Sequence, residues 1–147
     1  MRLFRSFALL TLPLWLAACA PLALFASGSG PEYQGYKQSL GVYVASDKVN
    51  TLCLSPALRL AIWDVEGYFG KKIVMNSGYR TPWHNAEVGG ADQSYHKKCM
   101  AADISIPGVR KSDLIAYART VGLVGGLGCY PGRTFIHIDV RERPRGH

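Results

Sequence analysis

Residues 100–106, MAADISI, and residues 134–140, TFIHIDV, alternate aliphatic side chains with side chains of other kinds. Alternation with a period of two predicts β-strands, because successive side chains of a strand point to opposite faces of a sheet. Asp103 therefore lies opposite the aliphatic row of the first strand. His137 and Asp139 lie opposite the aliphatic row of the second strand. The two strands are predicted to carry ionisable groups on the face that turns away from the core.

Two helices and a further strand are predicted around these strands. Ser55 is an N-cap candidate followed by proline, and apolar residues then recur at helical spacing until Gly70, a stop signal. Residues 72–76, KIVMN, are predicted as a short strand and residues 112–121 as a second helix. Residues 77–94 are dense in turn formers and are predicted as a long loop. Long ordered loops in compact domains usually carry function.

The first 26 residues have the composition of an export signal. Two arginines precede an uncharged, mostly apolar run that extends to residue 26. Within it LAAC, residues 16–19, resembles the lipobox of bacterial lipoproteins, which predicts acylation of Cys19. Ordinary cleavage near the end of the run and an uncleaved membrane anchor are the alternatives. Residues 27–38, rich in glycine and polar side chains, are predicted as a flexible tether, and residues 39–147 as the folded domain.

The composition fits one exported domain. A chain of 147 residues with 48% hydrophobic and 18% charged residues has room for one globular core, which excludes a multidomain machine. The net charge of +7 suits nucleic acid, anionic lipid or an acidic cell-wall polymer and does not choose between them. Export would place Cys53, Cys99 and Cys129 where disulfides persist. If Cys19 carries lipid, these three form at most one bridge, and the sequence does not select the pair.

His96, Asp103 and His137 have the donor types of a catalytic zinc site. On one helix His96 and Asp103 would lie too far apart along the axis, and on one straight strand they would face opposite ways. They meet only if the chain bends between them. Two imidazoles and one carboxylate leave a fourth zinc position open for water, whose pKa the metal lowers towards neutrality.

Several motifs, taken in chain order, resemble one family of enzymes. They are SGYR (77–80), HN (84–85), VGGA (88–91), SYH (94–96), AAD (101–103) and FIHID (135–139). Together they resemble the zinc D-Ala-D-Ala carboxypeptidase and murein endopeptidase family, part of the metallopeptidase group named for lysostaphin, D-Ala-D-Ala peptidases and sonic hedgehog. The resemblance covers about residues 53–140. It implies an α+β fold in which a small antiparallel sheet, flanked by helices, carries the zinc site.

The resemblance also implies roles for individual residues. It makes His96, Asp103 and His137 the zinc ligands, and Arg80 a clamp for the substrate or the transition state. A guanidinium suits the clamp because it binds a carboxylate or a developing oxyanion through two N–H groups. Ser94 and Tyr130 are further candidates for substrate contacts.

The chain departs from the family at positions that matter for catalysis. The glycine usually found between the first His and the Asp is Cys99, so that this turn has a different backbone or is constrained by a disulfide. The positions of the usual general base hold Thr134 and Phe135. Asp139 is then the best available base. It is equally well interpreted as a carboxylate that orients an imidazole. Glu87 is a weaker candidate for the base.

We therefore expect an exported periplasmic or cell-envelope protein, attached to the membrane by lipid on Cys19. Its expected function is that of a zinc metallopeptidase that hydrolyses peptide bonds in peptidoglycan stem peptides or crosslinks, with Asp139 and Arg80 catalytic. Peptidoglycan peptides are the expected partners, nucleic acid is not, and the chain is expected to be monomeric. One alternative is a non-catalytic cell-wall-binding lipoprotein that retains the zinc site. The other is a basic interaction domain whose structural metal takes a fourth protein ligand, for instance Cys99.

Overall fold

The computed structural model describes residues 30–142. The predicted signal segment, Cys19 and the first residues of the predicted tether lie outside the described residues. Among the helices of the described part, none combines the length and the apolar character that crossing a membrane requires.

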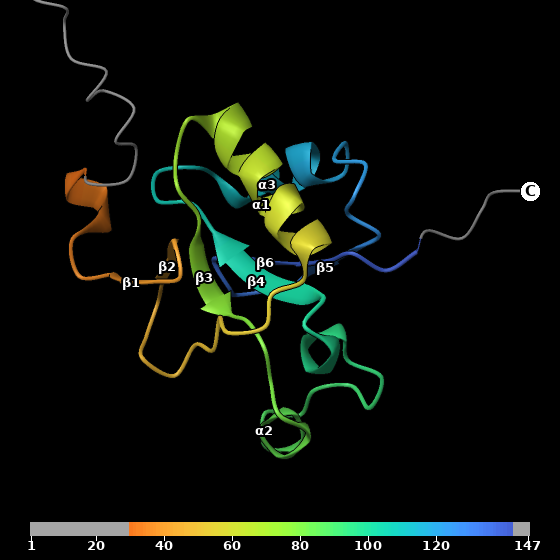
Figure 1. Ribbon diagram of the computed structural model, residues 1–147. Helices are drawn as coiled ribbons and strands as arrows, with labels where there is room; N and C mark the ends of the chain where they lie inside the picture. Colours follow the sequence, from red (N-terminus) through yellow and green to blue (C-terminus); the bar gives the residue numbers. More distant parts are fainter. Residues whose placement is uncertain (1–29, 143–147) are drawn as a thin grey trace, which may run out of the picture.

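A six-stranded mixed sheet forms the centre of the fold (Figure 1). Its strands, in spatial order, are β1 (Lys37–Ser39), β2 (Val42–Val44), β3 (Val74–Ser77), β4 (Ala101–Ser105), β6 (Ile136–Asp139) and β5 (Gly126–Cys129). All neighbouring strands are antiparallel except β2 and β3, which run parallel. The α+β class is confirmed. The predicted antiparallel sheet is mostly antiparallel, with one parallel pair. The segment between β2 and β3 includes a helix, and such a crossover returns the chain to start a parallel strand.

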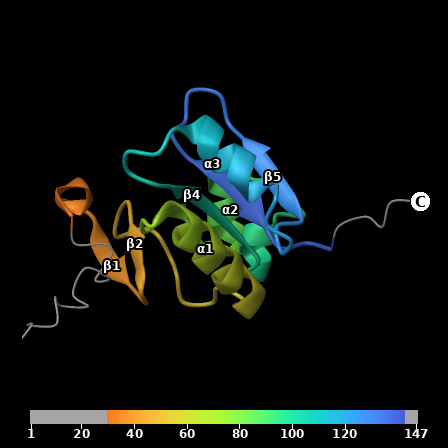
Figure 2. The ribbon, with the colours of Figure 1, turned by 90° about the horizontal axis from the view of Figure 1, so that it is seen from above.

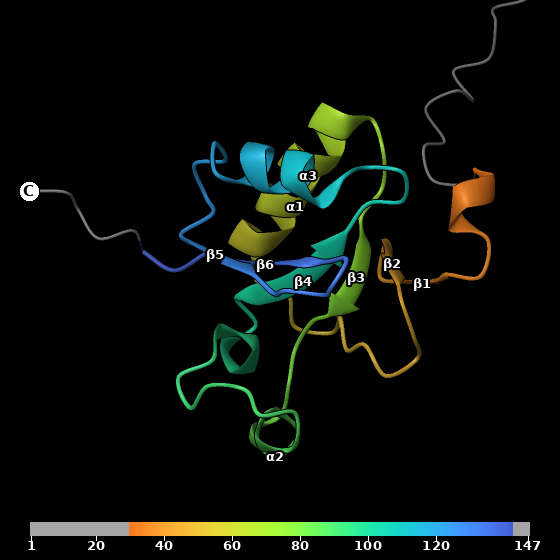
Figure 3. The same cartoon turned by 180° about the vertical axis from the view of Figure 1, so that it is seen from behind.

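Two helices cover one face of this sheet (Figures 1 and 3). They are α1 (Pro56–Phe69) and α3 (Lys111–Ala118). Helix α1 has the predicted ends: the Ser55 hydroxyl accepts a hydrogen bond from the backbone N–H of Leu58, and Gly70 ends the helix in the left-handed conformation with φ 59°. On the other side of the sheet lie α2 (Pro82–Glu87) and the 3-10 helix η3 (Tyr95–Lys98).

The hydrophobic core fills the space between these two helices and the sheet. Leu58 and Ile62 of α1 meet Ile104 of β4 and Ile136 and Ile138 of β6, and all five side chains are at most 1% exposed. Ile104, Ile136 and Ile138 belong to the predicted aliphatic rows. The intervening residues of β4 and β6 therefore face away from α1 and α3, which confirms the predicted alternation.

The packed domain begins earlier in the chain than predicted. The 3-10 helix η2 (Pro31–Tyr33) and strand β1 occupy part of the predicted tether, and the β1–β2 hairpin lies beside the helix-covered part of the sheet (Figure 2). Tyr33 is 5% exposed, stacks on Tyr43 with ring centroids 4.6 Å apart, and donates a hydrogen bond to the carbonyl of Lys72. Burial of this aromatic pair explains why a segment rich in glycine and polar residues is packed.

The predicted loop over residues 77–94 contains helix α2. The Thr81 hydroxyl caps it by accepting a hydrogen bond from the N–H of His84, and Pro82 occupies the first helical position. This is the same Ser/Thr–Pro signature that predicted α1, and it was present in the sequence. A second difference is β5, whose glycine-rich sequence GLGC has a low strand propensity but pairs with β6 along its whole length.

Candidate metal centre

His96 reaches the site from η3 rather than from the sheet. Its side chain is buried, and its Nδ1 donates a hydrogen bond to the carbonyl of Gly78 over 2.7 Å. A carbonyl oxygen accepts and cannot donate, so the proton of the neutral ring lies on Nδ1. The lone pair of Nε2 is then free to bind a cation.

Asp103 and His137 are brought together by strand register. They are directly paired residues on the antiparallel strands β4 and β6. His137 Nδ1 lies 3.0 Å from Asp103 Oδ1, and His137 Nε2 lies 3.2 Å from Asp139 Oδ2. If Nε2 carries the ring proton and donates it to Asp139, the lone pair of Nδ1 faces Asp103.

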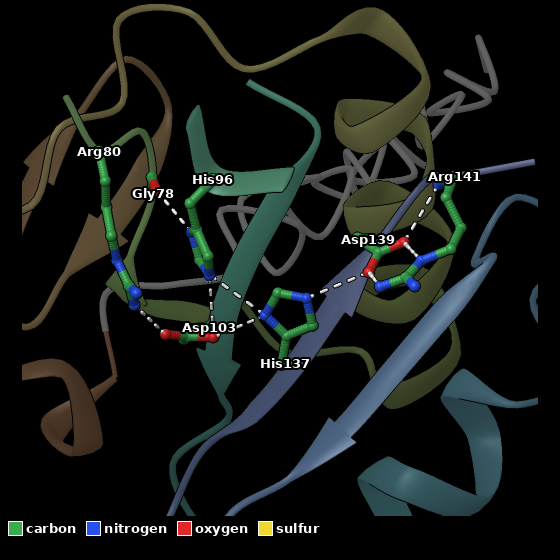
Figure 4. A network of polar contacts seen from close by, with 7 residues as sticks. All are labelled: Gly78, Arg80, His96, Asp103, His137, Asp139 and Arg141. Atoms are coloured by element: carbon green, nitrogen blue, oxygen red, sulfur yellow. Dashed lines mark hydrogen bonds and ion pairs between the residues drawn. The ribbon is translucent and has the colours of Figure 1, made fainter. Parts of the chain in front are cut away.

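Three donors thus converge on one point, as Figure 4 shows. His96 Nε2 lies 3.1 Å from His137 Nδ1 and 3.3 Å from Asp103 Oδ1, and one ligand atom from each residue lies within 4.8 Å of the others. In the tautomer in which Nε2 of His137 donates to Asp139 and Nδ1 of His96 donates to Gly78, two lone pairs and a carboxylate oxygen face one another. This arrangement is repulsive unless a cation lies between the atoms, so these residues fit zinc by donor type and orientation.

The charge of Asp103 is maintained by its partners. Burial alone would raise the pKa of this carboxyl group, but without a metal the rings of His137 and His96 lower it to about 2, through hydrogen bonds from a protonated nitrogen that faces Asp103 and through their charge. The carboxylate is therefore ionised at neutral pH, which is the form that binds a cation.

Arg80 holds the other oxygen of the same carboxylate. Its Nη2 donates to Asp103 Oδ2 over 2.8 Å, and its Nε donates to the hydroxyl of Ser77 over 2.8 Å. The Arg80 side chain is 17% exposed and lines the cleft described below. Arg80 therefore aims Oδ1 at the two imidazoles while it remains accessible to a bound molecule.

Asp139 lies behind His137, away from the point where the three donors meet (Figure 4). Asp139 is completely buried. Arg141 donates hydrogen bonds to both of its oxygens: Nε to Oδ1 over 2.7 Å, and Nη2 to Oδ2. Burial would raise the pKa of Asp139, but hydrogen bonds from Arg141 and His137 bring it below its ordinary value. A carboxylate with a lowered pKa is a weak proton acceptor. The geometry favours Asp139 as the residue that orients His137.

The neighbouring strand makes room for this ion pair. Gly126 of β5 pairs with Asp139, and a Cβ at Gly126 would overlap the Asp139 carboxylate and the Arg141 guanidinium. Gly128 pairs with His137, and a Cβ there would lie 3.0 Å from the Cβ of His137. The two glycines of the GLGC sequence thus admit the side chains that stand behind the metal site.

The three donors open onto a cleft with a volume of about 1080 Å³. Ser94 and Tyr130, both predicted to contact substrate, line it. Burial, together with the charge of Asp103, raises the pKa of Tyr130, so its phenol keeps a proton to donate. Arg133 and Arg141 also line the cleft. Sequence reasoning missed both, because an arginine without a motif is usually solvated surface.

The other candidates for a proton acceptor lie elsewhere. Glu87 of α2 is exposed and lies 3.4 Å from His84 on the same short helix. Neither residue is among those that line the cleft. In the described part of the chain, Asp103 is the carboxylate that lines it.

One disulfide joins Cys53 to Cys99, and Cys129 is free and exposed. One bridge with one remaining thiol is the predicted outcome for these three residues. A disulfide sulfur is not a thiolate, so Cys99 does not serve as a fourth metal ligand. The donor group found among the described residues has three members, as an open catalytic site requires.

Replacing Asp139 by asparagine is expected to weaken zinc affinity by about 10- to 100-fold, because Asp139 fixes the orientation of the His137 ring. Hydrolysis should recover when zinc is raised. Competition with a chromogenic chelator measures the affinity, and Asp113→Asn, at an exposed site on α3, is the matched control. A different result would identify Asp139 as the base: zinc affinity would stay unchanged, and turnover at saturating zinc would fall by more than roughly 100-fold.

Two comparisons with known proteins bear on the family of this chain. The family model described as Peptidase M15 matches residues 38–139. The chain is also 34% identical over 93 residues to the peptidoglycan L,D-endopeptidase MepK of Escherichia coli strain K12, and equally to MepK of Escherichia coli O157:H7 and of Shigella flexneri. Each match covers 58% of this chain and 50% of the relative, so the chain spans about half the length of the curated relatives it matches. The family match, residues 38–139, includes Arg80, the three donors and Asp139. The chain belongs to the Peptidase M15 family.

Proposed function

We propose that this protein is a zinc-dependent peptidase that cleaves peptide bonds in peptidoglycan. The observation that carries the proposal is the convergence of His96, Asp103 and His137 on one point at an arginine-lined cleft. Membership of the Peptidase M15 family supports it. When bound, zinc would polarise the scissile carbonyl and lower the pKa of a water molecule.

The surrounding residues have distinct tasks in this proposal. Arg80 orients Asp103 and offers its remaining N–H groups to negative charge that develops on the substrate. Tyr130 donates a hydrogen bond from its protonated phenol, and Ser94 borders the same cleft. Asp139, held by Arg141, keeps His137 in the tautomer whose Nδ1 binds metal.

We propose crosslinks as the substrates, cut by an endopeptidase. The relatives are named L,D-endopeptidases, and the cleft, at about 1080 Å³, is slightly larger than the roughly 300–1,000 Å³ of ordinary small-molecule sites. Three arginines line this cleft: Arg80, Arg133 and Arg141. Their charge suits stem peptides, which carry free carboxylates.

Digestion of defined muropeptides tests the proposal. The purified protein, loaded with zinc, should cleave dimers joined by an L,D crosslink, and mass spectrometry of the products identifies the bond. Dimers with a D,D crosslink and uncrosslinked pentapeptides show whether the activity extends to the other reaction types of the family. His137→Ala is the inactive control. A zinc-loaded protein that leaves every one of these peptides intact is not a peptidoglycan peptidase.

A non-catalytic cell-wall-binding protein is the second candidate. Two observations favour it. The only carboxylate lining the cleft in the described residues is Asp103, which belongs to the donor group, and Thr134 and Phe135 occupy the positions of the usual general base. This candidate predicts that the zinc-loaded protein retains muropeptide dimers in equilibrium dialysis and releases them unchanged.

We further propose that the protein is exported and held at the membrane by lipid on Cys19. The basic and apolar start of the chain and the LAAC sequence support this. In cells fed a labelled fatty acid, the Cys19→Ser variant should lose the label and leave the membrane fraction. A variant that is still labelled would exclude Cys19 as the attachment point.

A further inference from the structure

The Cys53–Cys99 disulfide ends at the bend that brings His96 and Asp103 together. Cys99 directly follows η3 and has φ 60°, a left-handed backbone conformation that residues with a side chain seldom adopt. Its N–H donates to the carbonyl of His96, and the next N–H, that of Met100, donates to Tyr95. The chain thus turns at Cys99 from the 3-10 helix into β4.

The other end of the disulfide, Cys53, lies in a segment that also contacts the backbone around Gly78, whose carbonyl binds the His96 ring. This segment, residues 50–55, precedes α1. Its Asn50 carbonyl accepts the N–H of Tyr79, next to Gly78, whose own carbonyl fixes the His96 ring. A Cβ at Gly78 would overlap the Asn50 carbonyl, so the two backbones are in close contact.

The same segment also contacts Cys99 itself. The N–H of Ser55, the N-cap of α1, donates to the carbonyl of Cys99 over 2.8 Å. The disulfide and this hydrogen bond therefore both hold residue 99 against the start of α1. Because Leu58, Ile62 and Val65 of α1 are buried in the hydrophobic core, residue 99 is attached to a closely packed part of the fold.

We propose that the Cys53–Cys99 disulfide is a positioning element for the metal site, which holds residue 99 in the left-handed conformation that a glycine would adopt freely. Its loss would let residue 99 relax towards φ < 0, and η3 would then move relative to β4. His96 would no longer face Asp103 and His137 at the distances given above. The inference rests on the proposed zinc site and adds to it a dependence of metal affinity on the oxidised state of the pair.

A matched pair of variants tests this role. Both Cys53→Ala with Cys99→Ala and Cys53→Ala with Cys99→Gly lack the disulfide, and they differ only in whether residue 99 tolerates φ 60°. The alanine pair should bind zinc about 10-fold or more weakly than the unmodified protein in chelator competition. The glycine pair should regain most of that affinity. Cys129→Ser, which removes the exposed free thiol, should bind zinc normally.

A second measurement does not depend on metal. In the zinc-free proteins, the amide protons of residues 97–100 should exchange faster in the alanine pair than in the glycine pair. Equal zinc affinity and equal exchange in the unmodified protein and the alanine pair would overturn the inference. The inference would also be overturned if the alanine pair and the glycine pair lost zinc affinity equally. The covalent link, and not the backbone conformation of residue 99, would then be what matters. Absence of zinc binding in the unmodified protein would instead refute the proposed function.

Discussion

Replacing His137 by alanine is expected to abolish stoichiometric zinc binding and, with it, hydrolysis of muropeptides. His137 Nδ1 lies within 3.1 Å of both Asp103 Oδ1 and His96 Nε2, so the substitution removes one of three donors. The loss of affinity should exceed the roughly 100-fold that accompanies loss of a residue behind a ligand. His96→Ala should have the same effect, because each donor supplies one corner of the site.

Metal analysis of the dialysed proteins measures this effect. The matched control is His84→Ala, which removes an exposed imidazole from α2 that does not line the cleft. It should retain one zinc per chain. Circular dichroism establishes that the variants are folded. If both His96→Ala and His137→Ala keep stoichiometric zinc, the metal centre is assigned to the wrong residues.

Replacing Arg80 by glutamine is expected to lower turnover by about 100- to 1,000-fold at saturating zinc, the range for removal of one donor that stabilises an oxyanion. Arg80→Gln also frees Asp103 Oδ2, so that zinc affinity should fall by a smaller factor, about 10-fold or more. The two effects separate when turnover is measured against zinc concentration. The loss of turnover that excess zinc does not restore measures the contribution of Arg80 to stabilising the transition state.

Arg80→Lys distinguishes charge from geometry. Lysine keeps the positive charge but not the planar fork that contacts Ser77 and Asp103 together. We expect Arg80→Lys to remain well below the unmodified protein in turnover. Arg119→Lys, on the surface after α3, is the control for an arginine far from the cleft. Full activity of Arg80→Lys would reduce the role of Arg80 to that of a point charge.

The strand and helix pattern around the site was predictable because it depends on local sequence. Alternation in MAADISI and TFIHIDV fixed which residues of β4 and β6 face the core, and hence that Asp103 and His137 do not. Ser55, Pro56 and Gly70 marked the ends of α1 through capping chemistry that involves only neighbouring residues. Residue types alone indicated a zinc donor set, and the motifs indicated the family.

The contacts of the site depend on segments that are far apart in the sequence. The sequence did not say which nitrogen of His137 faces the cluster, because that depends on Asp139 on the one side and Asp103 on the other. The sequence also did not show that Arg141 donates hydrogen bonds to Asp139. This contact favours Asp139 as a positioning residue over Asp139 as the base. Strand pairing between β4 and β6 created the contact of His137 with Asp103. Asp139 contacts His137 and Arg141 from two residues away, and Gly126 of the paired strand β5 leaves the space that these side chains occupy.

The sequence by itself determined helices α1 and α3, strands β3, β4 and β6, the donor types and the family of this protein. The tertiary structure alone decided the convergence of the donors and the choice of Cys53 as the partner of Cys99. The physical reason is the range of the interactions. Propensity and capping act within a few residues, whereas the bend at Cys99 and the carbonyl of Gly78 that fixes His96 exist only after the core has packed α1 against the sheet.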